Sequence, residues 1–336
     1  MTSGAAGGRR TLAVAAASGI AVLAVSIAAC GGSGDAGIAR AAGVGSAGSS
    51  STGPASSGSA SSGVAASASA GSAGGGTSTA PPSPGAPAAV GSERADPFTA
   101  VQAYLAQRSG TVLAAVYDVR TGQSWRLGDG PPQDEASAVK LDILETLLSE
   151  SDGTGLSAGN QGLAGQMIED SDNDAATSLW YAAGGTAGLA AYDDRAGLTR
   201  TTPSACVVCA DFPWPGWGLT TTVPYDQITL LKQLIKPGPL LTTDERQYAL
   251  SLLENVTPGQ AWGVSGGVPA GVTVALKDGW LPLNDDNTDW QINSEGWVSG
   301  DGRDYLISVL TTGNPTEQYG IDTISEISTL IWTQLR

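Results

Sequence analysis

Ser137-Ala138-Val139-Lys140 stands at the start of an apolar run that continues through Leu148. If this run is helical, Ser137 and Lys140 share a face, one turn apart, and leucines continue that face. Burial against apolar surface would lower the pKa of the lysine and let its amine accept a proton near neutral pH. A serine beside such a base is a candidate nucleophile. The alternative interpretation is a helix cap followed by a lysine that reaches toward solvent.

The composition excludes several classes of protein. The 336 residues contain no histidine, so a Ser-His-Asp triad is excluded and a serine-lysine pair remains. With only three cysteines, the chain also lacks the usual zinc ligands, and we expect neither a metal nor a cofactor. The net charge of -16 argues against nucleic acid as a partner, because phosphate binding needs clustered Lys and Arg. The lysines are Lys140, Lys232, Lys236 and Lys277, and two of these four lie in apolar runs.

Residues 1–30 are typical of an export signal. Arg9 and Arg10 precede an apolar stretch, and Ile27-Ala28-Ala29-Cys30 resembles a bacterial lipobox, in which the cysteine carries lipid. We therefore expect Cys30 to anchor the chain to the outer face of the cell membrane. Two alternatives are an uncleaved membrane helix over residues 12–29 and twin-arginine export through Arg9-Arg10.

The next segment, residues 31–95, consists almost entirely of Gly, Ala, Ser and Pro. It has too little bulky apolar content to offset the entropy of ordering, and we expect a disordered tether. At about 5–6 Å × √n for a flexible linker, its typical reach is roughly 45 Å. The folded part then covers residues 96–336, a size suited to one domain.

Patterning within residues 96–336 predicts strands toward both ends and helices in the middle. Predicted strands cover residues 112–118, 123–127, 272–276, 290–298 and 305–311. Beside the helix at Ser137, predicted helices cover residues 97–105, 164–169, 175–183, 186–195, 225–235, 243–254 and 321–335. This order predicts an α/β (α+β) fold, in which helices cover an antiparallel sheet and the middle forms an all-helical lobe.

Three short motifs follow one another along the folded part: Ser137-x-x-Lys140, Ser171-Asp172-Asn173 and Lys277-Asp278-Gly279. Their order is similar to that of the three signatures of class A β-lactamases and penicillin-binding proteins. Residues 167–176 also resemble the segment that enters a helix in that family. The resemblance spans residues 98–336 and implies a β-lactamase-like or transpeptidase-like fold with serine acyl transfer. The interval between Ser137 and Ser171 is shorter than in β-lactamases, so we expect a reduced all-helical lobe.

The resemblance implies a role for each motif. Ser137 attacks an amide or β-lactam carbonyl, and Lys140 accepts its proton. Ser171 relays a proton to the leaving nitrogen, and Asn173 binds the amide of the substrate. Lys277 binds the substrate carboxylate and helps to lower the pKa of Lys140 by charge repulsion.

The resemblance also implies an oxyanion hole built from the backbone N–H groups of Ser137 and Trp280, with Asp278 and Gly279 beside the substrate. Structural roles remain open for two motifs. Ser, Asp and Asn are favoured capping residues, so residues 171–173 can simply begin a helix. Lys277 can be an edge-strand lysine that deters aggregation.

Two departures from the family pattern concern the substrate and the turnover. Asp278 stands where the family has a hydroxyl residue, and its carboxylate would repel a substrate anion unless it pairs with Lys277 or turns away. Residues 204–211 match the family region that supplies a deacylating glutamate, yet Asp211 is their only carboxylate. We therefore expect slow hydrolysis of the acyl-enzyme or a peptidase-like reaction.

The same region contains Cys206 and Cys209. Outside the cytoplasm we expect them to form a static disulfide, with thiol exchange as the alternative. Tryptophans follow nearby and near the third motif, and they serve either core packing or stacking on a sugar or peptide. They are Trp214, Trp217, Trp280 and Trp297.

The sequence thus predicts an extracytoplasmic, monomeric lipoprotein that is acylated at Ser137 by a β-lactam or a peptidoglycan peptide. The rival is a catalytically silent protein that binds a cell-wall fragment in the same cleft. Asp278 and the missing glutamate favour the rival, whereas the presence of both Ser137 and Lys140 favours the enzyme. A structural wall spacer is a third class, supported only by the tether.

Overall fold

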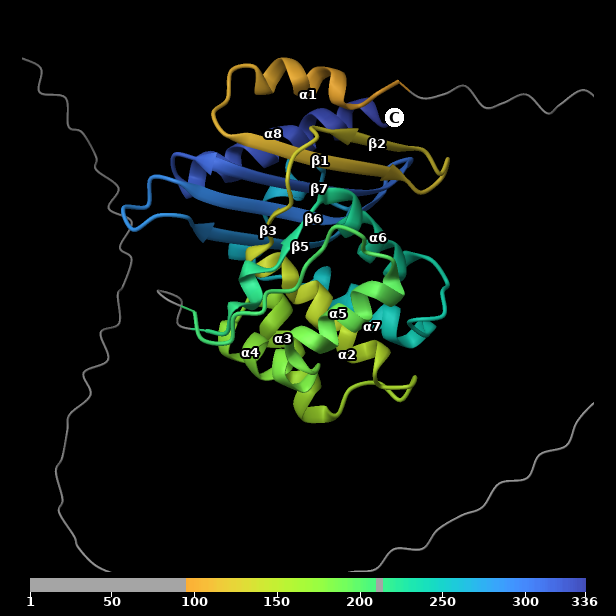
Figure 1. Cartoon of the computed structure of the whole chain (residues 1–336). Helices are drawn as coiled ribbons and strands as arrows, with labels where there is room; N and C mark the ends of the chain where they lie inside the picture. The colour runs from red at the N-terminus through yellow and green to blue at the C-terminus, as the bar shows by residue number, and fades with distance from the viewer. Residues whose placement is uncertain (1–94, 210–213) are drawn as a thin grey trace, which may run out of the picture. The chain divides into compact units, whose positions relative to one another are not determined.

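The computed structural model describes residues 95–209 and 214–336 (Figure 1). These residues belong to one structural unit, Pro84–Arg336. The expected signal segment, Cys30 and nearly all of the expected tether lie outside the described residues, and so does Asp211. Among the helices that are described, none is both long and apolar enough to cross a membrane.

A five-stranded antiparallel sheet lies at the centre of the fold, with the strand order β2-β1-β7-β6-β5. Its strands are β1 (Thr111–Asp118), β2 (Ser124–Leu127), β5 (Thr273–Pro282), β6 (Trp290–Gly300) and β7 (Arg303–Asn314). β1 pairs with β7 along its whole length. The two ends of the folded part therefore close a single sheet, with β2 and β5 at its two edges.

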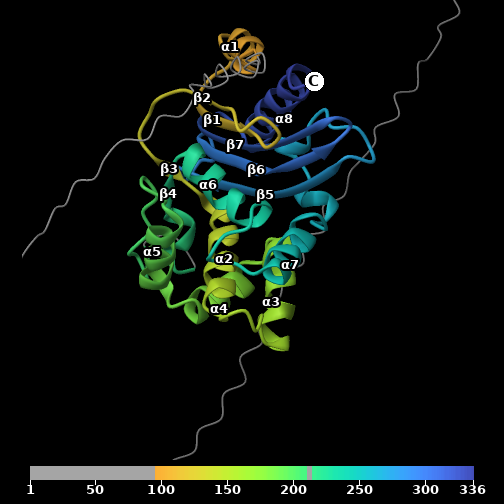
Figure 2. The same cartoon turned by 90° about the vertical axis from the view of Figure 1, so that its right-hand side faces the viewer.

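Helices cover both faces of this sheet (Figures 1 and 2). α1 (Phe98–Leu105) and α8 (Glu317–Gln334) lie on one face. The other face carries a helical lobe that consists of α2 (Lys140–Ser149), α3 (Ala158–Glu169), α4 (Asn173–Ala182), α5 (Gly185–Ala196), α6 (Pro224–Ile235) and α7 (Thr243–Leu253). Each face has its own hydrophobic cluster. The predicted architecture of an antiparallel sheet, covering helices and a helical lobe is confirmed.

Short elements connect the sheet with the lobe. β3 (Gln133–Asp134) pairs with β4 (Thr221–Thr222), and the 3₁₀ helix η1 (Ala136–Val139) follows β3 directly. The remaining 3₁₀ helices are η2 (Gly216–Leu219), η3 (Pro258–Gln260) and η4 (Gly263–Ser265). α2 continues from η1 into the middle of the lobe and is buried from Lys140 to Leu148. This burial includes polar side chains, because Lys140, Asp142, Glu145 and Thr146 are buried with the leucines and Ile143 of the helix.

The structure differs from the predicted elements at two of the motifs. Ser137 lies in η1 rather than in the α-helix, which begins only at Lys140. β5 does not end at Leu276 as predicted but continues through the third motif to Pro282, because β6 pairs with it as far as Trp290. The third motif therefore lies inside an edge strand.

Several carboxyl groups are buried between the sheet and α2: Glu135, Asp142, Glu145, Asp193 and Glu295. Burial is the main cause that raises the pKa of each group, and neighbouring carboxyls add repulsion. The pKa of Asp193 rises to about 7 and that of Glu295 to about 8. These groups keep their protons in the folded state at pH values where the unfolded chain has lost them.

We expect the free energy of unfolding to decrease as the pH rises from 5 to 8. A carboxyl with a raised folded pKa stabilises the fold fully below its unfolded pKa, near 4, and this contribution is lost as the pH rises through the folded pKa. The lowered pKa values of Lys140, Lys232 and Lys277 act in the opposite direction, but these three lysines oppose six buried carboxyls, because burial also raises the pKa of Asp278.

Thermal unfolding of the chain at pH 5 and pH 8 measures this effect. Each net proton changes the stability by about 1.4 kcal/mol per pH unit. The variant Asp193→Asn should lower the difference between the two pH values, because it removes one of the titrating groups. An equal or higher melting temperature at pH 8 would contradict the expectation.

Candidate active site

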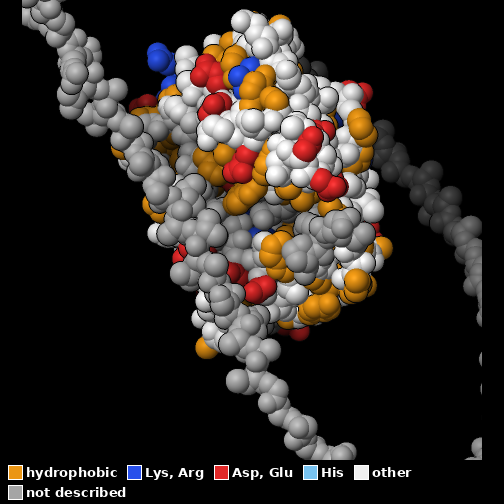
Figure 3. All heavy atoms as spheres, turned by 90° about the vertical axis from the view of Figure 1, so that its left-hand side faces the viewer, with side chains coloured by type: hydrophobic (Ala, Val, Ile, Leu, Met, Phe, Trp, Pro, Cys, Tyr) orange, Lys and Arg blue, Asp and Glu red, His pale blue; other side chains and the backbone are white. Residues whose placement is uncertain are grey.

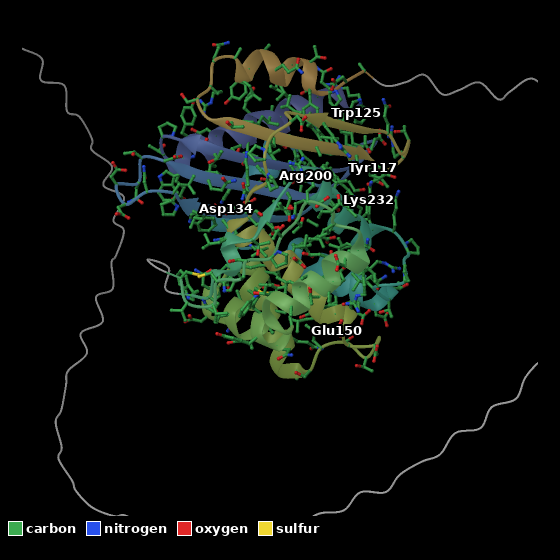
Figure 4. All side chains as sticks on the ribbon, in the orientation of Figure 1. Tyr117, Trp125, Asp134, Glu150, Arg200 and Lys232 are labelled. Carbon is green, nitrogen blue, oxygen red and sulfur yellow. A yellow bond between two sulfur atoms is a disulfide. The ribbon has the colours of Figure 1, made fainter. Side chains whose placement is uncertain are left out.

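Ser137 lies at the mouth of a cleft between the sheet edge and the helical lobe. The cleft has a volume of ≈ 390 Å³. It is lined by Ala136, Ser137, Asn173, Trp214, Trp217, Gly218, Trp280, Leu281, Pro282 and Trp290. Figure 3 shows a hollow on this side of the molecule with hydrophobic side chains above and below it. Figure 4 places Asp134, shortly before Ser137 in the chain, at the junction of sheet and lobe.

β5 passes directly against the backbone of η1 at Gly279. A Cβ atom on Gly279 would lie 2.7 Å from the backbone N of Ala138 and 2.8 Å from that of Ser137. A side chain at this position does not fit, so the close approach requires glycine. The next residue of β5 is Trp280, which lines the cleft with Ser137. The two backbone donors expected for an oxyanion hole thus lie on adjoining segments.

Ser171 connects the two lysines of the motifs. Lys140 Nζ lies 2.6 Å from the carbonyl oxygen of Ser171, 3.0 Å from its Oγ and 2.7 Å from Oδ1 of Asn173. Lys277 Nζ donates to the same Oγ at 3.0 Å and to the carbonyl oxygen of Asp278 at 2.9 Å. Residues from all three motifs therefore meet at one buried hydroxyl.

Burial gives Lys140 the properties of a base. It lowers the pKa of Lys140 to about 6, helped by the charge of Lys277 and opposed by Asp172. A neutral amine has two N–H bonds and one lone pair. It can donate to the oxygens of Ser171 and Asn173 and accept the hydroxyl proton of Ser171, which satisfies all three contacts.

Lys277 is also held inside the protein, with 1% of its surface exposed. Burial lowers the pKa of Lys277 to about 8, against the effect of the Asp278 and Glu295 carboxyls. β5 is an edge strand, yet a buried lysine cannot repel another sheet edge. The interpretation of Lys277 as an aggregation guard is therefore excluded.

The local backbone explains how the second motif serves both a cap and the site. Asp172 is the N-cap of α4, and its Oδ1 accepts from the backbone N–H of Ala175 at 2.7 Å. Ser171 has a φ of 56°, in the left-handed region that few non-glycine residues adopt. Ser171 and Asn173 flank the cap and turn toward Lys140. Capping and the arrangement of the site are thus compatible.

Two predicted contacts are placed differently. Among the described residues no hydrogen bond joins Ser137 to Lys140, whose bonds go to Ser171 and Asn173. Asp278 does not line the cleft: its Oδ2 accepts from the backbone N–H of Trp262 at 3.3 Å, and it is 0% exposed. Successive residues of a strand point to opposite faces, so Asp278 turns away from the face of Lys277 and Gly279.

A disulfide joins Cys206 and Cys209. The backbone N–H of Gly216 donates to the carbonyl oxygen of Cys206 at 2.7 Å, which fixes this loop against η2. Trp214 and Trp217, which follow later in the chain, line the cleft, and Lys140 Nζ lies 5.2 Å from the ring centroid of Trp217.

Sequence reasoning missed Trp290, which also lines the cleft. Trp290 is the first residue of β6 and lies opposite Pro282 of β5. Pairing the two predicted strands beyond the third motif would have brought it to the site. Trp297, by contrast, is not part of the cleft lining, and its Nε1 donates to Asp304 Oδ1 at 2.6 Å.

The chemistry of the cleft is defined by few polar groups. Its described lining contains neither a carboxylate nor a Lys or Arg side chain, and Ser137 and Asn173 are its polar side chains. Within the part of the chain that is described, no group of three or more Cys, Asp or Glu residues is placed to hold a metal ion. The arrangement can acylate a serine with the help of a neutral lysine, but its described walls supply no carboxylate to activate water.

Comparison with protein families identifies one matching family model. The model of the Beta-lactamase enzyme family matches residues 149–335. This range includes the second and third motifs and begins after Ser137 and Lys140.

The chain is similar to curated proteins and to solved structures. It is 30% identical over 209 residues to the "Putative lipoprotein LppW" of Mycobacterium tuberculosis and of Mycobacterium bovis, which covers 59% of this chain and 62% of each relative. The chain thus spans less than two thirds of the length of these relatives.

Among solved structures, the TLA-1 extended-spectrum β-lactamase aligns with a TM-score of 0.60 at 18% identity, over 71% of this chain and 98% of that one. A class A β-lactamase from Bacteroides cellulosilyticus aligns with a TM-score of 0.59 at 18% identity, over 72% and 99% of the two chains. At this level of identity, the likeness establishes the fold.

Proposed function

Because the chain belongs to the Beta-lactamase enzyme family, we propose that it is a serine hydrolase acylated at Ser137 by a β-lactam or a cell-wall peptide amide. The observation that carries this proposal is the buried Lys140, whose Nζ contacts Ser171 and Asn173 beside a cleft that Ser137 lines. A buried amine with a lowered pKa is an available base, and a serine near it is an available nucleophile.

Acylation begins when Ser137 Oγ attacks the carbonyl carbon and its proton passes to Lys140 Nζ. The carbonyl oxygen becomes an oxyanion, which the backbone N–H groups of Ser137 and Trp280 stabilise. The bond to the leaving nitrogen then breaks, and this nitrogen takes the hydroxyl proton of Ser171. Lys140 returns its proton to Ser171 Oγ over 3.0 Å, which leaves an ester on Ser137 and a neutral lysine.

We expect deacylation to be the slow step of this cycle. Water must attack the ester, and a general base normally removes its proton. The described lining of the cleft offers no carboxylate for this purpose. The acyl-enzyme therefore persists, or the acyl group passes to an amine nucleophile, as in a peptidase-like reaction.

The relatives support an extracytoplasmic location. The curated relatives carry the name of a lipoprotein, and Cys30 ends a lipobox-like sequence. Lipid on Cys30 would hold the enzyme at the outer face of the cell membrane, next to the cell-wall peptides that are among its proposed substrates.

The test is to incubate the full chain with a panel of β-lactams and to follow its intact mass over time. We expect an adduct with the mass of the complete β-lactam that persists after free drug is removed and is absent in Ser137→Ala. Ser251→Ala, a change at an exposed serine of α7, is the matched control and should keep the adduct. Rapid consumption of the drug would contradict slow deacylation.

A silent binding protein is the second candidate, favoured by the absence of a carboxylate from the described cleft lining. It predicts saturable, reversible binding of wall fragments and no covalent adduct in the wild-type chain or in Ser251→Ala.

A further inference from the structure

We propose that this chain has an anion site outside the cleft, where β2 and α6 meet. Its ligand is a phosphate group, carried by a small phosphate ester or by a lipid headgroup. The site is built from Arg126 on β2, Lys232 in the last turn of α6 and Lys236 at the C-cap of that helix. These three residues form the cationic patch. None of them lines the cleft, so the inference does not depend on the proposed function.

Strand pairing and helix packing bring the cationic patch together from distant parts of the sequence. Arg126 lies opposite Ala115 of β1, and Tyr117 is two residues further along the same strand. All three side chains therefore lie on one face of the sheet. This face carries the helical lobe, because Ala115 and Tyr117 belong to its hydrophobic cluster. α6 packs there, and Arg126 Cζ lies 3.9 Å from the ring centroid of Tyr225, near the start of α6.

The two lysines share one aromatic ring. Lys232 Nζ and Lys236 Nζ lie 3.9 Å and 4.4 Å from the ring centroid of Tyr117, and Lys236 Nζ also donates to the Tyr117 hydroxyl. Figure 4 shows Tyr117 and Lys232 close together, on the other side of the molecule from Asp134. Burial lowers the pKa of Lys232, and the positive charges of Lys236 and Arg126 lower it further. The cations are therefore close enough to repel one another.

This repulsion is not relieved by carboxylates of the protein. Within residues 95–209 and 214–336, none of the three cations forms a salt bridge. The charges that act on the pKa of Lys232 are those of Lys236 and Arg126. The chain as a whole has 32 Asp and Glu residues against 16 Lys and Arg residues. Crowded cations without a counter-charge, in a chain with an excess of acids, favour an external anion.

Arg126 and Lys232 line a hollow of ≈ 80 Å³ with unused donors. Their contacts among the described residues are with the faces of Tyr225 and Tyr117, and neither side chain donates a hydrogen bond to a described oxygen. A guanidinium has five N–H donors and an ammonium has three. Ser124, on the same face of β2 as Arg126, adds a hydroxyl, and no carboxylate belongs to the described lining of the hollow.

The donors and the size of this hollow fit a phosphate group. A phosphate presents several charged oxygens, and an arginine can bind two of them with its planar fork. A lysine on the facing element adds a compact charge for a further oxygen, whereas a carboxylate has only two oxygens and is satisfied by one fork. A whole drug-sized ligand usually needs about 300–1,000 Å³. A hollow of ≈ 80 Å³ suits a single polar group at the end of a larger molecule.

A second hollow shares Arg126 and Tyr225 with the first but offers fewer unused donors. Its volume is ≈ 60 Å³, and Arg200 and Asp129 also line it. Arg200 Nη2 donates to a backbone carbonyl oxygen at 2.7 Å, and the Asp129 carboxylate would repel an anion. The phosphate is therefore assigned to the hollow that Lys232 lines.

Calorimetric titration of the full chain with glycerol 1-phosphate at low ionic strength tests the site. We expect saturable binding, with a dissociation constant that increases at least about tenfold in Lys232→Gln. Arg195→Gln is the matched control. It removes the same charge from α5, where Arg195 pairs with Glu150 at 2.7 Å, and it should bind like the wild type. Equal affinity in Lys232→Gln and the wild type would overturn the inference.

A lipid arm distinguishes the two sources of the phosphate. The full chain is sedimented with vesicles of phosphatidylglycerol and with vesicles of phosphatidylcholine, to which lipid on Cys30 would contribute equally. Stronger sedimentation with phosphatidylglycerol that is lost in Lys232→Gln assigns the lipid headgroup. Equal sedimentation with both vesicles, together with binding of glycerol 1-phosphate, assigns the soluble ester. If neither arm shows binding that depends on Lys232, the inference is overturned.

Arg126→Lys separates recognition by the fork from the effect of charge alone. This variant keeps the positive charge, and its affinity for glycerol 1-phosphate should still decrease about tenfold. Melting temperatures without ligand show whether Arg126→Lys and Lys232→Gln fold. Glycerol 1-phosphate should raise the melting temperature of the wild type more than that of either variant, because a ligand stabilises the folded state that binds it. Equal stabilisation of all three proteins would exclude a site at Arg126 and Lys232.

Discussion

Replacing Lys140 with methionine is expected to lower the rate of acylation of Ser137 by about 10²–10⁴-fold. Methionine has a similar volume, but it has no lone pair on nitrogen that can take the serine proton. In the wild-type chain the rate should rise as the pH increases through about 6, the pKa of Lys140, because only the neutral amine is a base. The variant should lack this rise.

The measurement is the second-order rate of adduct formation between pH 5 and pH 7.5. Lys232→Met is the matched control, because Lys232 lies on α6, with Nζ 3.9 Å from the ring centroid of Tyr117, and does not contact the cleft lining. Melting temperatures of both variants show whether they fold, since Lys140→Met removes the donor to the carbonyl oxygen of Ser171 and to Oδ1 of Asn173. A Lys140→Met variant that reacts within threefold of wild type would exclude Lys140 as the base.

The sequence predicted the chemistry of the site better than its contacts. Lys140 and Lys277 stood in apolar runs of a chain with few lysines, and both are buried in the structure. Hydrophobic patterning is local, so it reveals which residues enter the core. It does not reveal the hydrogen-bond partners of a buried polar side chain. The bonds from Lys140 to Ser171 and Asn173 depend on how α4 packs against α2.

The end of β5 shows a second limit of sequence reasoning. Lys277-Asp278-Gly279-Trp280 followed by Leu281-Pro282 contains residues that disfavour strands, and the predicted strand stopped at Leu276. Pairing with β6 overrides this preference and keeps the strand intact through the motif. The direction of Asp278 follows from that continuation, because strand alternation sends its side chain to the face of α8.

The buried carboxyls could not be foreseen either. Asp142 and Glu145 lie in the sequence of α2 at positions that a surface helix would expose to water. Their burial results from the position of α2 at the centre of the lobe, a tertiary property. The composition shows that the chain is acidic, but it does not show that several carboxyl groups are buried between the sheet and α2.

Replacing Gly279 with alanine is expected to reduce acylation by about 10²–10³-fold, the effect of losing one oxyanion donor. The new Cβ would come within 2.8 Å of the backbone nitrogen of Ser137 and within 2.7 Å of the carbonyl oxygen of Glu135. Both are backbone atoms that cannot rotate away, so β5 and η1 must separate. The N–H groups of Ser137 and Trp280 would then no longer converge on one oxygen.

The control for this variant is Gly162→Ala in α3, where an added Cβ meets no atom within 4 Å and alanine favours the helix. Rates of adduct formation and melting temperatures are compared for both variants. A Gly279→Ala protein that melts several degrees lower but acylates at the wild-type rate would show that the close approach of β5 to η1 stabilises the fold and is not needed for acylation. Loss of the adduct in a protein that remains folded would show that the distance between these two segments sets the reactivity of Ser137.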